Sequence, residues 1–208
     1  MKGRDVALSV AGVIVVLLLL IYWSPNVASL FHTDHMVSST LDHEQYVVEE
    51  QFENKQEAAN IIARLNQMLV RVITHLKRNR MNSSYAEHIT YLSSNFNPCV
   101  IGEHLPTDLK YTSYVAQKGI RIRLCLRTAE DRNTFHDFNT LTFVSLHELS
   151  HLAVRDYGHS AGFWDVFRFI LLEASAIGEI KLVDYSKHPQ KYCGLPSNIS
   201  DNPAIDKY

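Results

Sequence analysis

The chain of 208 residues has few cysteines and no excess of positive charge, and each shortage excludes a class of protein. The three cysteines, Cys99, Cys125 and Cys193, are too few and too widely spaced for a disulfide framework or a cysteine-ligated zinc site, which leaves one bridge and one free thiol open. Lys and Arg number 20 against 22 Asp and Glu, for a net charge of −2. Because the basic residues are scattered apart from a short run at 77–80, we expect no nucleic-acid partner.

A long hydrophobic run lies near the N-terminus. Residues 6–23 are almost entirely apolar and end in Tyr22 and Trp23, and the only charged groups that precede them lie in the tail 1–5. This length spans a bilayer, and the basic residues of the tail predict a cytosolic N-terminus with the main domain on the exoplasmic or lumenal side. We therefore interpret 6–23 as a transmembrane signal-anchor and 24–43 as a juxtamembrane linker.

A cleaved signal peptide is the alternative, with Val27-Ala28-Ser29 as a small-residue exit. The apolar stretch is long for such a peptide, which favours an uncleaved anchor. Either interpretation places the protein in the membrane pathway and leaves residues 44–208 for one domain, which is long enough for a substantial core.

The most informative motif is His147-Glu148-Leu149-Ser150-His151. On a helix, His147 and His151 lie about 40° apart around the axis, so both imidazoles can reach one metal ion. Glu148 is placed to hold a water against that metal. This HExxH pattern is typical of zinc-dependent peptidases, in which Zn²⁺ lowers the pKa of bound water to about 7 and a carboxylate takes its proton. The alternative is a helix that carries two surface histidines by coincidence.

The third ligand is predicted to be His159. In a continuous helix it would lie about 12 Å beyond His151, too far for the same ion. The chain must therefore break between Asp156 and His159, and Gly158 permits the break by adopting a left-handed conformation. A loop histidine that caps the next helix is the other possibility.

Glu173 is the rival ligand. It is the lone acid in the middle of a second apolar helix predicted over 163–183. An acid in that setting needs a partner, so it either binds the zinc from a neighbouring helix, orients a ligand histidine, or lies on a narrow surface stripe.

Two further elements complete the expected fold. Residues 43–79 predict a long amphipathic helix. Residues 119–127 alternate in polarity, which predicts a half-exposed edge strand that aligns a substrate by backbone pairing or simply discourages aggregation through its arginines. Among the later residues, Tyr185 and Tyr192 are candidates for an oxyanion-stabilising hydroxyl, although packing tyrosines fit the pattern better.

The HExxH motif, Gly158-His159 and Phe163-Trp164 together resemble the WLM and SprT-like metallopeptidases. The resemblance covers about residues 139–178 and implies an α+β, zincin-like fold, zinc bound by His147, His151 and His159, and Glu148 as general base. Metzincin-type motifs leave about five residues between the second and third histidines; this chain has seven. The chain also resembles membrane-anchored WLM-like proteins of large DNA viruses, through Lys118-Gly119, Cys125-Leu126-Arg127, Asn139-Thr140-Leu141 and Tyr192-Cys193-Gly194.

The resulting expectation is a membrane-anchored zinc metallopeptidase that hydrolyses a protein or peptide substrate, held in a viral or host membrane. Two other classes stay open. One is a catalytically inactive, zinc-stabilised membrane scaffold or virion protein, for which a fourth protein ligand such as Glu173 is expected. The other is an adaptor without metal that binds a partner through the long amphipathic helix.

Overall fold

The structure is a computed structural model that describes residues 35–106, 113–116, 121–185, 187–188 and 190–194. The expected cytosolic tail 1–5, the signal-anchor at 6–23 and most of the linker lie outside these residues. Within the described part of the chain, no helix is both long enough and apolar enough to cross a membrane.

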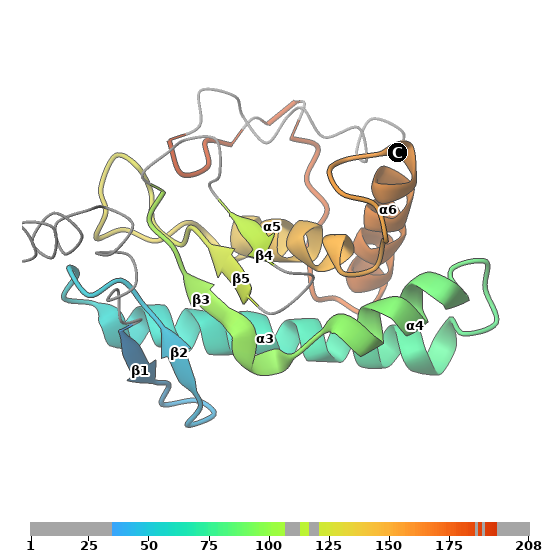
Figure 1. The fold of residues 1–208 in the computed structure, drawn as a ribbon. Helices are drawn as coiled ribbons and strands as arrows, with labels where there is room; N and C mark the ends of the chain where they lie inside the picture. Colours follow the sequence, from blue (N-terminus) through green and yellow to red (C-terminus); the bar gives the residue numbers. More distant parts are fainter. Residues whose placement is uncertain (1–34, 107–112, 117–120, 186, 189, 195–208) are drawn as a thin grey trace, which may run out of the picture. The chain divides into compact units, whose positions relative to one another are not determined.

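The described residues combine four α-helices with one five-stranded sheet, which confirms the expected α+β class (Figure 1). The helices are α3 (Lys55–Asn79), α4 (Ala86–Asn95), α5 (Phe138–His151) and α6 (Ala161–Ala176). The strands are β1 (Met36–Ser38), β2 (Gln45–Val47), β3 (Ile101–Glu103), β4 (Tyr114–Ala116) and β5 (Arg121–Leu124), and a short 3-10 helix, Pro98–Val100, precedes β3.

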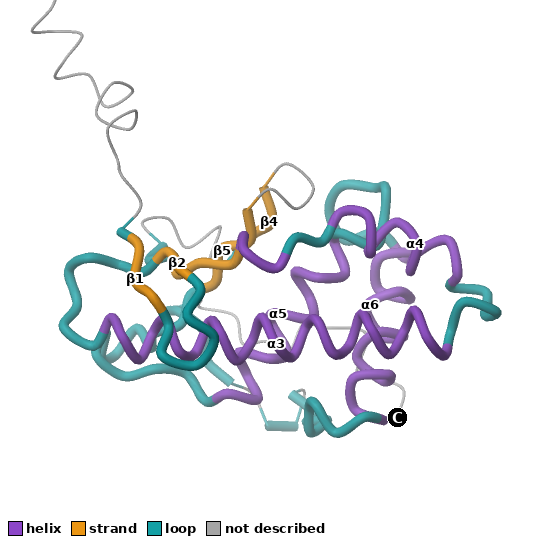
Figure 2. The backbone as a smooth tube through the Cα atoms, turned by 90° about the horizontal axis from the view of Figure 1, so that it is seen from below, coloured by secondary structure: helices purple, strands orange, loops and turns teal. Residues whose placement is uncertain are grey.

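Helix α3 runs along the whole domain and contacts strands at one end and α4 at the other (Figures 1 and 2). Its apolar residues recur every three or four positions, so one face is buried while the opposite face is charged. Each buried Leu, Ile or Met of this stripe contributes about 1.5–3 kcal/mol to folding. The buried residues are Ala58, Ala59, Ile62, Ala63, Leu65, Asn66, Met68, Leu69, Val72, Ile73 and Leu76.

The predicted helix over 43–79 is wrong in its first part, because α3 begins only at Lys55. Residues Gln45–Val47 form β2, which pairs antiparallel with β1, and Tyr46 between them is buried. The predicted linker 24–43 is also too long, since β1 belongs to the sheet and the compact unit starts at His35. The apolar periodicity is strong only from Ala58 onward, so the sequence before it carried no real helical signal.

The predicted exposed edge strand is in the wrong place. The sheet order is β1-β2-β3-β5-β4, so β5 lies inside the sheet, parallel to β3 and antiparallel to β4. Arg123, expected on an exposed face, is buried and donates to the carbonyl of Val100. The strand at this edge of the sheet is β4, which is too short to show the alternation that revealed β5.

A buried ion pair and a disulfide fix the far end of β5. Arg127 and Glu103 are each 1% exposed and pair through Nε and Oε1, while Phe52 and Phe135 cover the guanidinium. A bridge joins Cys125 to Cys193 of the C-terminal segment, with Cα atoms 6.1 Å apart. The sequence left open one bridge among the three cysteines, and the structure shows a bridge between Cys125 and Cys193.

Candidate metal centre

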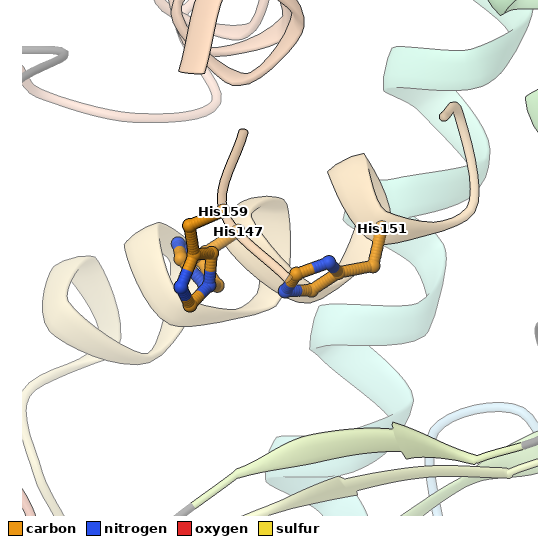
Figure 3. A group of neighbouring side chains, drawn as sticks. All are labelled: His147, His151 and His159. Carbon is orange, nitrogen blue, oxygen red and sulfur yellow. The ribbon is translucent and has the colours of Figure 1, made fainter. Parts of the chain in front are cut away.

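Helix α5 begins at Phe138. Its N-cap is Asp137, whose carboxylate accepts from the backbone N–H of Thr140 at 3.0 Å. The helix is buried along most of its length, so the few polar side chains that it carries need partners. His147 and His151 both lie on it near its C-terminal end (Figure 3).

The chain leaves the helix at His151, and this early end brings His159 back toward it. The left-handed conformation predicted for Gly158 is confirmed, with φ +79°, which glycine adopts without strain, but the helix ends at His151, before the predicted break between Asp156 and His159. Ser160 then caps α6 by accepting from the N–H of Phe163 at 3.2 Å. His159 therefore lies between a glycine turn and a helix cap, two local features that hold its backbone in place.

His147, His151 and His159 gather into one group (Figure 3). One ring nitrogen of each lies within 4.8 Å of the others, and the Nε2 atoms of His147 and His159 are 2.9 Å apart. The first two histidines are half-buried and the third is exposed. The structure thus brings together the three residues that the sequence assigned to one metal ion.

Aromatic side chains of α6 pack against all three imidazoles. Phe163 stacks on His151 with ring centroids 4.3 Å apart, and Trp164 stacks on His159 at 5.1 Å. His147 meets Phe163, Trp164 and Phe167 edge-on. These contacts restrict the rotation of the rings, so α6 orients a group that α5 and the loop supply.

The surroundings of His147 and His159 favour the neutral imidazole. Burial lowers the pKa of His147 well below its ordinary value, and the neighbouring His151 and His159 lower it further. Burial also lowers the pKa of His159. Neutral imidazole is the form that binds a metal, so the environment favours metal binding at neutral pH.

The donor set fits zinc. In a tetrahedral site with Zn–N distances of about 2.0–2.1 Å, ligand nitrogens lie about 3.3 Å apart, which small ring movements in this group would reach. The described residues place no fourth His, Cys, Asp or Glu in the group. Three protein ligands with one open position is the arrangement of catalytic rather than structural zinc sites.

Glu148 lies between the two helical histidines in sequence and is buried. Within the described part of the chain its carboxylate has no hydrogen-bond or ion-pair partner, and burial raises its pKa to about 8. It lies near enough to Tyr192 for its charge to act on that hydroxyl, whose pKa is raised mainly by burial. A buried carboxylate without a partner is costly, and such groups concentrate at functional sites.

Glu173 is not in the histidine group. Its Oε2 lies 2.7 Å from Nε2 of His75, and its Oε1 accepts from Nε of Arg80 at 2.8 Å. It follows Phe167 by six residues, about 120° around the helix, which turns it from the histidines toward α3. These contacts correct the alternative prediction that Glu173 binds the zinc. The second apolar helix also ends at Ala176, short of the predicted 183.

The two candidate tyrosines serve in packing. The hydroxyl of Tyr192 donates to the carbonyl of Cys125 at 2.8 Å and contacts Ser113 Oγ at 2.7 Å. Tyr185 is buried edge-on against Phe143, with centroids 5.0 Å apart. The stacking role of Trp164 was not deduced from the sequence, although Phe163-Trp164 stood out there as a motif.

Comparisons with known proteins find sequence similarity to three viral proteins. No model of a known protein family matches the sequence. Protein R325 of Acanthamoeba polyphaga mimivirus is 31% identical over 160 residues, which cover 76% of this chain and 80% of that protein. Protein 136R of Invertebrate iridescent virus 6 is 33% identical over 75 residues, and 042R of Invertebrate iridescent virus 3 is 42% identical over 66; each match covers 40% of the viral protein.

Among solved structures, the fold is similar to Wss1 of Saccharomyces cerevisiae, with a TM-score of 0.48 and 20% identity over 62% of this chain and 87% of that one. Wss1 from S. pombe gives a TM-score of 0.32 and 21% identity over 51% and 85% of the two chains. Likeness of this degree does not establish a shared activity. The mimivirus match has a higher identity, 31%, and covers more of this chain, 76%. The chain belongs to the same protein family as R325 of Acanthamoeba polyphaga mimivirus.

Proposed function

We propose that the protein is a membrane-anchored zinc metallopeptidase that hydrolyses peptide bonds with Glu148 as general base. The observation that carries the proposal is the three-histidine group on and beside the HExxH helix, together with the buried, unpartnered carboxylate of Glu148. His147, His151 and His159 would hold the ion. Zn²⁺ bound there supplies a Lewis acid that polarises a carbonyl and lowers the pKa of water.

In this proposal Glu148 transfers the proton from the water to the leaving amine. Its carboxylate takes a proton from the attacking water and passes it to the amine that leaves, so one group acts first as base and then as acid. Burial raises the pKa of Glu148 to about 8 in the metal-free protein, and a bound Zn²⁺ would lower it by favouring the charged carboxylate, which is the form that accepts the proton. Among the residues that the structure describes, none forms a competing hydrogen bond with Glu148, so both carboxylate oxygens are available for this work.

Strand β4 is the edge at which we expect a protein or peptide substrate to lie. It packs against α5, which carries the two helical histidines, and its outer side, which pairs with no other strand among the described residues, can pair with an extended peptide. This transfers to β4 the role that the sequence suggested for 119–127. No nucleic-acid partner is proposed.

The anchor at 6–23 and an exoplasmic or lumenal domain form part of the proposal. The disulfide between Cys125 and Cys193 supports this side of the membrane, because such bridges persist in oxidising compartments and are rare in the cytosol. The competing interpretation of an inactive zinc-stabilised scaffold expects a fourth protein ligand, and Glu173, its best candidate, pairs with His75 and Arg80 instead.

The test compares the full-length wild-type chain with Glu148→Gln in detergent, by zinc content and by cleavage of a peptide library. We expect one zinc per chain in both proteins and turnover only in the wild type, slowed at least about a hundredfold in the variant. Zinc without turnover in the wild type would favour the scaffold. Cleavage by Glu148→Gln at the wild-type rate would show that Glu148 is not the base.

A further inference from the structure

The metal centre depends on how the chain returns from the end of α5 to His159. The segment from Leu152 to Ser160 makes this return and connects the end of α5 to the start of α6. Helix α4 runs beside the start of the segment and supplies side chains to its backbone. The following inference rests on the proposed zinc site.

Two side chains of α4 bind the carbonyls at which the chain leaves the helix. Nδ1 of His88 lies 2.8 Å from the carbonyl oxygen of Ala153, and Nδ2 of Asn95 donates to that of Leu152 at 3.3 Å. Carbonyls at the C-terminal end of a helix lack partners within it, so they need donors from elsewhere. Since a carbonyl oxygen only accepts, Nδ1 of His88 carries the hydrogen.

A surface pocket lies on this side of the segment. A cavity of about 190 Å³ lies between α4 and the chain, lined among others by His88, Tyr91, Asp156 and Gly162. A third contact, Arg155 to Glu87 at 3.2 Å, joins two side chains that are more than three-quarters exposed, and such pairs stabilise little. Of the two hydrogen bonds from α4 to the backbone carbonyls of this segment named above, the bond from His88 is the shorter.

Helix α4 is itself fixed to α6. Tyr85, which precedes α4, stacks on Phe169 of α6 with ring centroids 3.9 Å apart, and its hydroxyl donates to Asp165 at 3.0 Å. Because α4 and α6 are joined in this way, the returning segment is held at both ends. His88 of α4 binds its beginning, and its end continues into α6.

We propose that His88 is a positioning residue of the metal centre. Its bond to Ala153 sets the direction in which the chain leaves α5, and through Gly158 that direction sets the place of His159. Loss of the bond lets the segment move into the adjoining cavity, which separates His159 from His147 and His151.

The experiment titrates full-length protein with Co²⁺ and records affinity and the visible absorption bands, which report coordination geometry. His88→Asn keeps an amide N–H near the position of Nδ1, while His88→Leu removes the donor. We expect His88→Leu to weaken Co²⁺ binding at least about tenfold with altered bands, and His88→Asn to stay within about twofold of wild type. Glu87→Gln, which breaks only the exposed ion pair, is the matched control and is expected to bind as wild type does.

His88→Gln guards against a leucine variant that fails to fold. It remains polar, but its amide reaches the position of Nε2 rather than Nδ1, so we expect affinity to fall toward that of His88→Leu. Wild-type affinity and bands in both His88→Leu and His88→Gln would overturn the positioning role and leave the zinc site standing. A folded wild-type protein that binds no Co²⁺ would instead overturn the proposed function, and this inference with it.

Discussion

At the scale of single residues, Gly158 decides whether His159 can reach the other histidines. A Cβ placed on it would meet no atom within 4 Å, so any cost of a side chain comes from the backbone at φ +79° alone. For L-residues that conformation costs about 1–2 kcal/mol.

Gly158→Ala is therefore expected to lower the free energy of unfolding by about 1 kcal/mol and to weaken zinc binding, as measured by urea denaturation and zinc titration. Gly162→Ala is the control. Gly162 lies within α6, where an added Cβ has an ordinary contact at 3.7 Å, so alanine should stabilise by about 0.5–1 kcal/mol. Equal effects of the two substitutions would contradict this account of Gly158.

Glu148 gives the metal-free protein a distinctive pH dependence. Its pKa is raised to about 8 in the folded state, against about 4.3 when unfolded, so in between the folded state holds a proton that the unfolded state does not. Stability from the neutral carboxyl is therefore full below the unfolded pKa and is lost as the pH rises to about 8.

His147 and His159, whose pKa values are lowered, act in the opposite direction, but only below about pH 6.5, where the unfolded imidazoles take up protons. Between pH 6.5 and 8, in a chelator, the wild type should lose about 1 kcal/mol of stability per pH unit. Glu148→Gln should show no such loss. A flat wild-type profile in chemical denaturation would show that Glu148 is not buried as described.

The site was more predictable than the fold at this scale. Three histidines and one glutamate follow from helix geometry and one glycine, because HExxH encodes its own three-dimensional arrangement. The partners of Glu173 were not predictable, since His75 and Arg80 lie far away in sequence on an element whose docking no local pattern encodes.

At the scale of elements, the contact between α3 and α6 depends on the carboxylate of Glu173. Burial alone would raise its pKa, but hydrogen bonds from Arg80 and His75 outweigh that effect and lower it. The charge therefore ties two helices together, away from the histidines.

Glu173→Gln keeps the shape of the side chain and removes the charge. We expect it to lower the free energy of unfolding at pH 7 by about 1–3 kcal/mol, because Arg80 and His75 lose a charged acceptor, while zinc content stays at the wild-type value. Denaturation and metal analysis on the same sample separate the two effects. A fall in zinc content without loss of stability would restore Glu173 as a ligand.

Helices and strands differed in how well the sequence revealed them. The helices α3, α5 and α6 carry long apolar patterns and all three were predicted, although the helix expected over 43–79 took in β2 and the helix expected over 163–183 ran past Ala176. Four of the strands have three residues each, too few for alternation to register, and the sheet joins β2, β3 and β5 in parallel across long stretches of chain. Such pairing depends on contacts remote in sequence.

At the scale of the whole molecule, the bridge from Cys125 to Cys193 closes a loop with a sequence separation of 68. Both cysteines are fully buried, and the neighbouring Tyr192 is bound to the carbonyl of Cys125. The bridge thus joins the C-terminal segment to the end of β5, and no pattern in the sequence distinguished this pairing from the others that three cysteines allow.

Removing the bridge with Cys193→Ser should lower the free energy of unfolding by about 2–4 kcal/mol, because the unfolded chain regains the freedom of the loop. The wild type under reducing conditions should fall to a similar value once the buried sulfurs are reached. Identical urea midpoints for wild type and variant would show that the bridge contributes nothing to stability.

Trp164 provides an intrinsic fluorescence probe of the metal centre. The chain has two tryptophans, Trp23 and Trp164, and only Trp164 lies within the compact unit, stacked on the ring of His159. Emission from a Trp23→Phe protein would therefore come from a single indole in contact with a proposed ligand. Quenching by a paramagnetic ion, or a spectral shift on zinc binding, would report occupancy during turnover without any added dye.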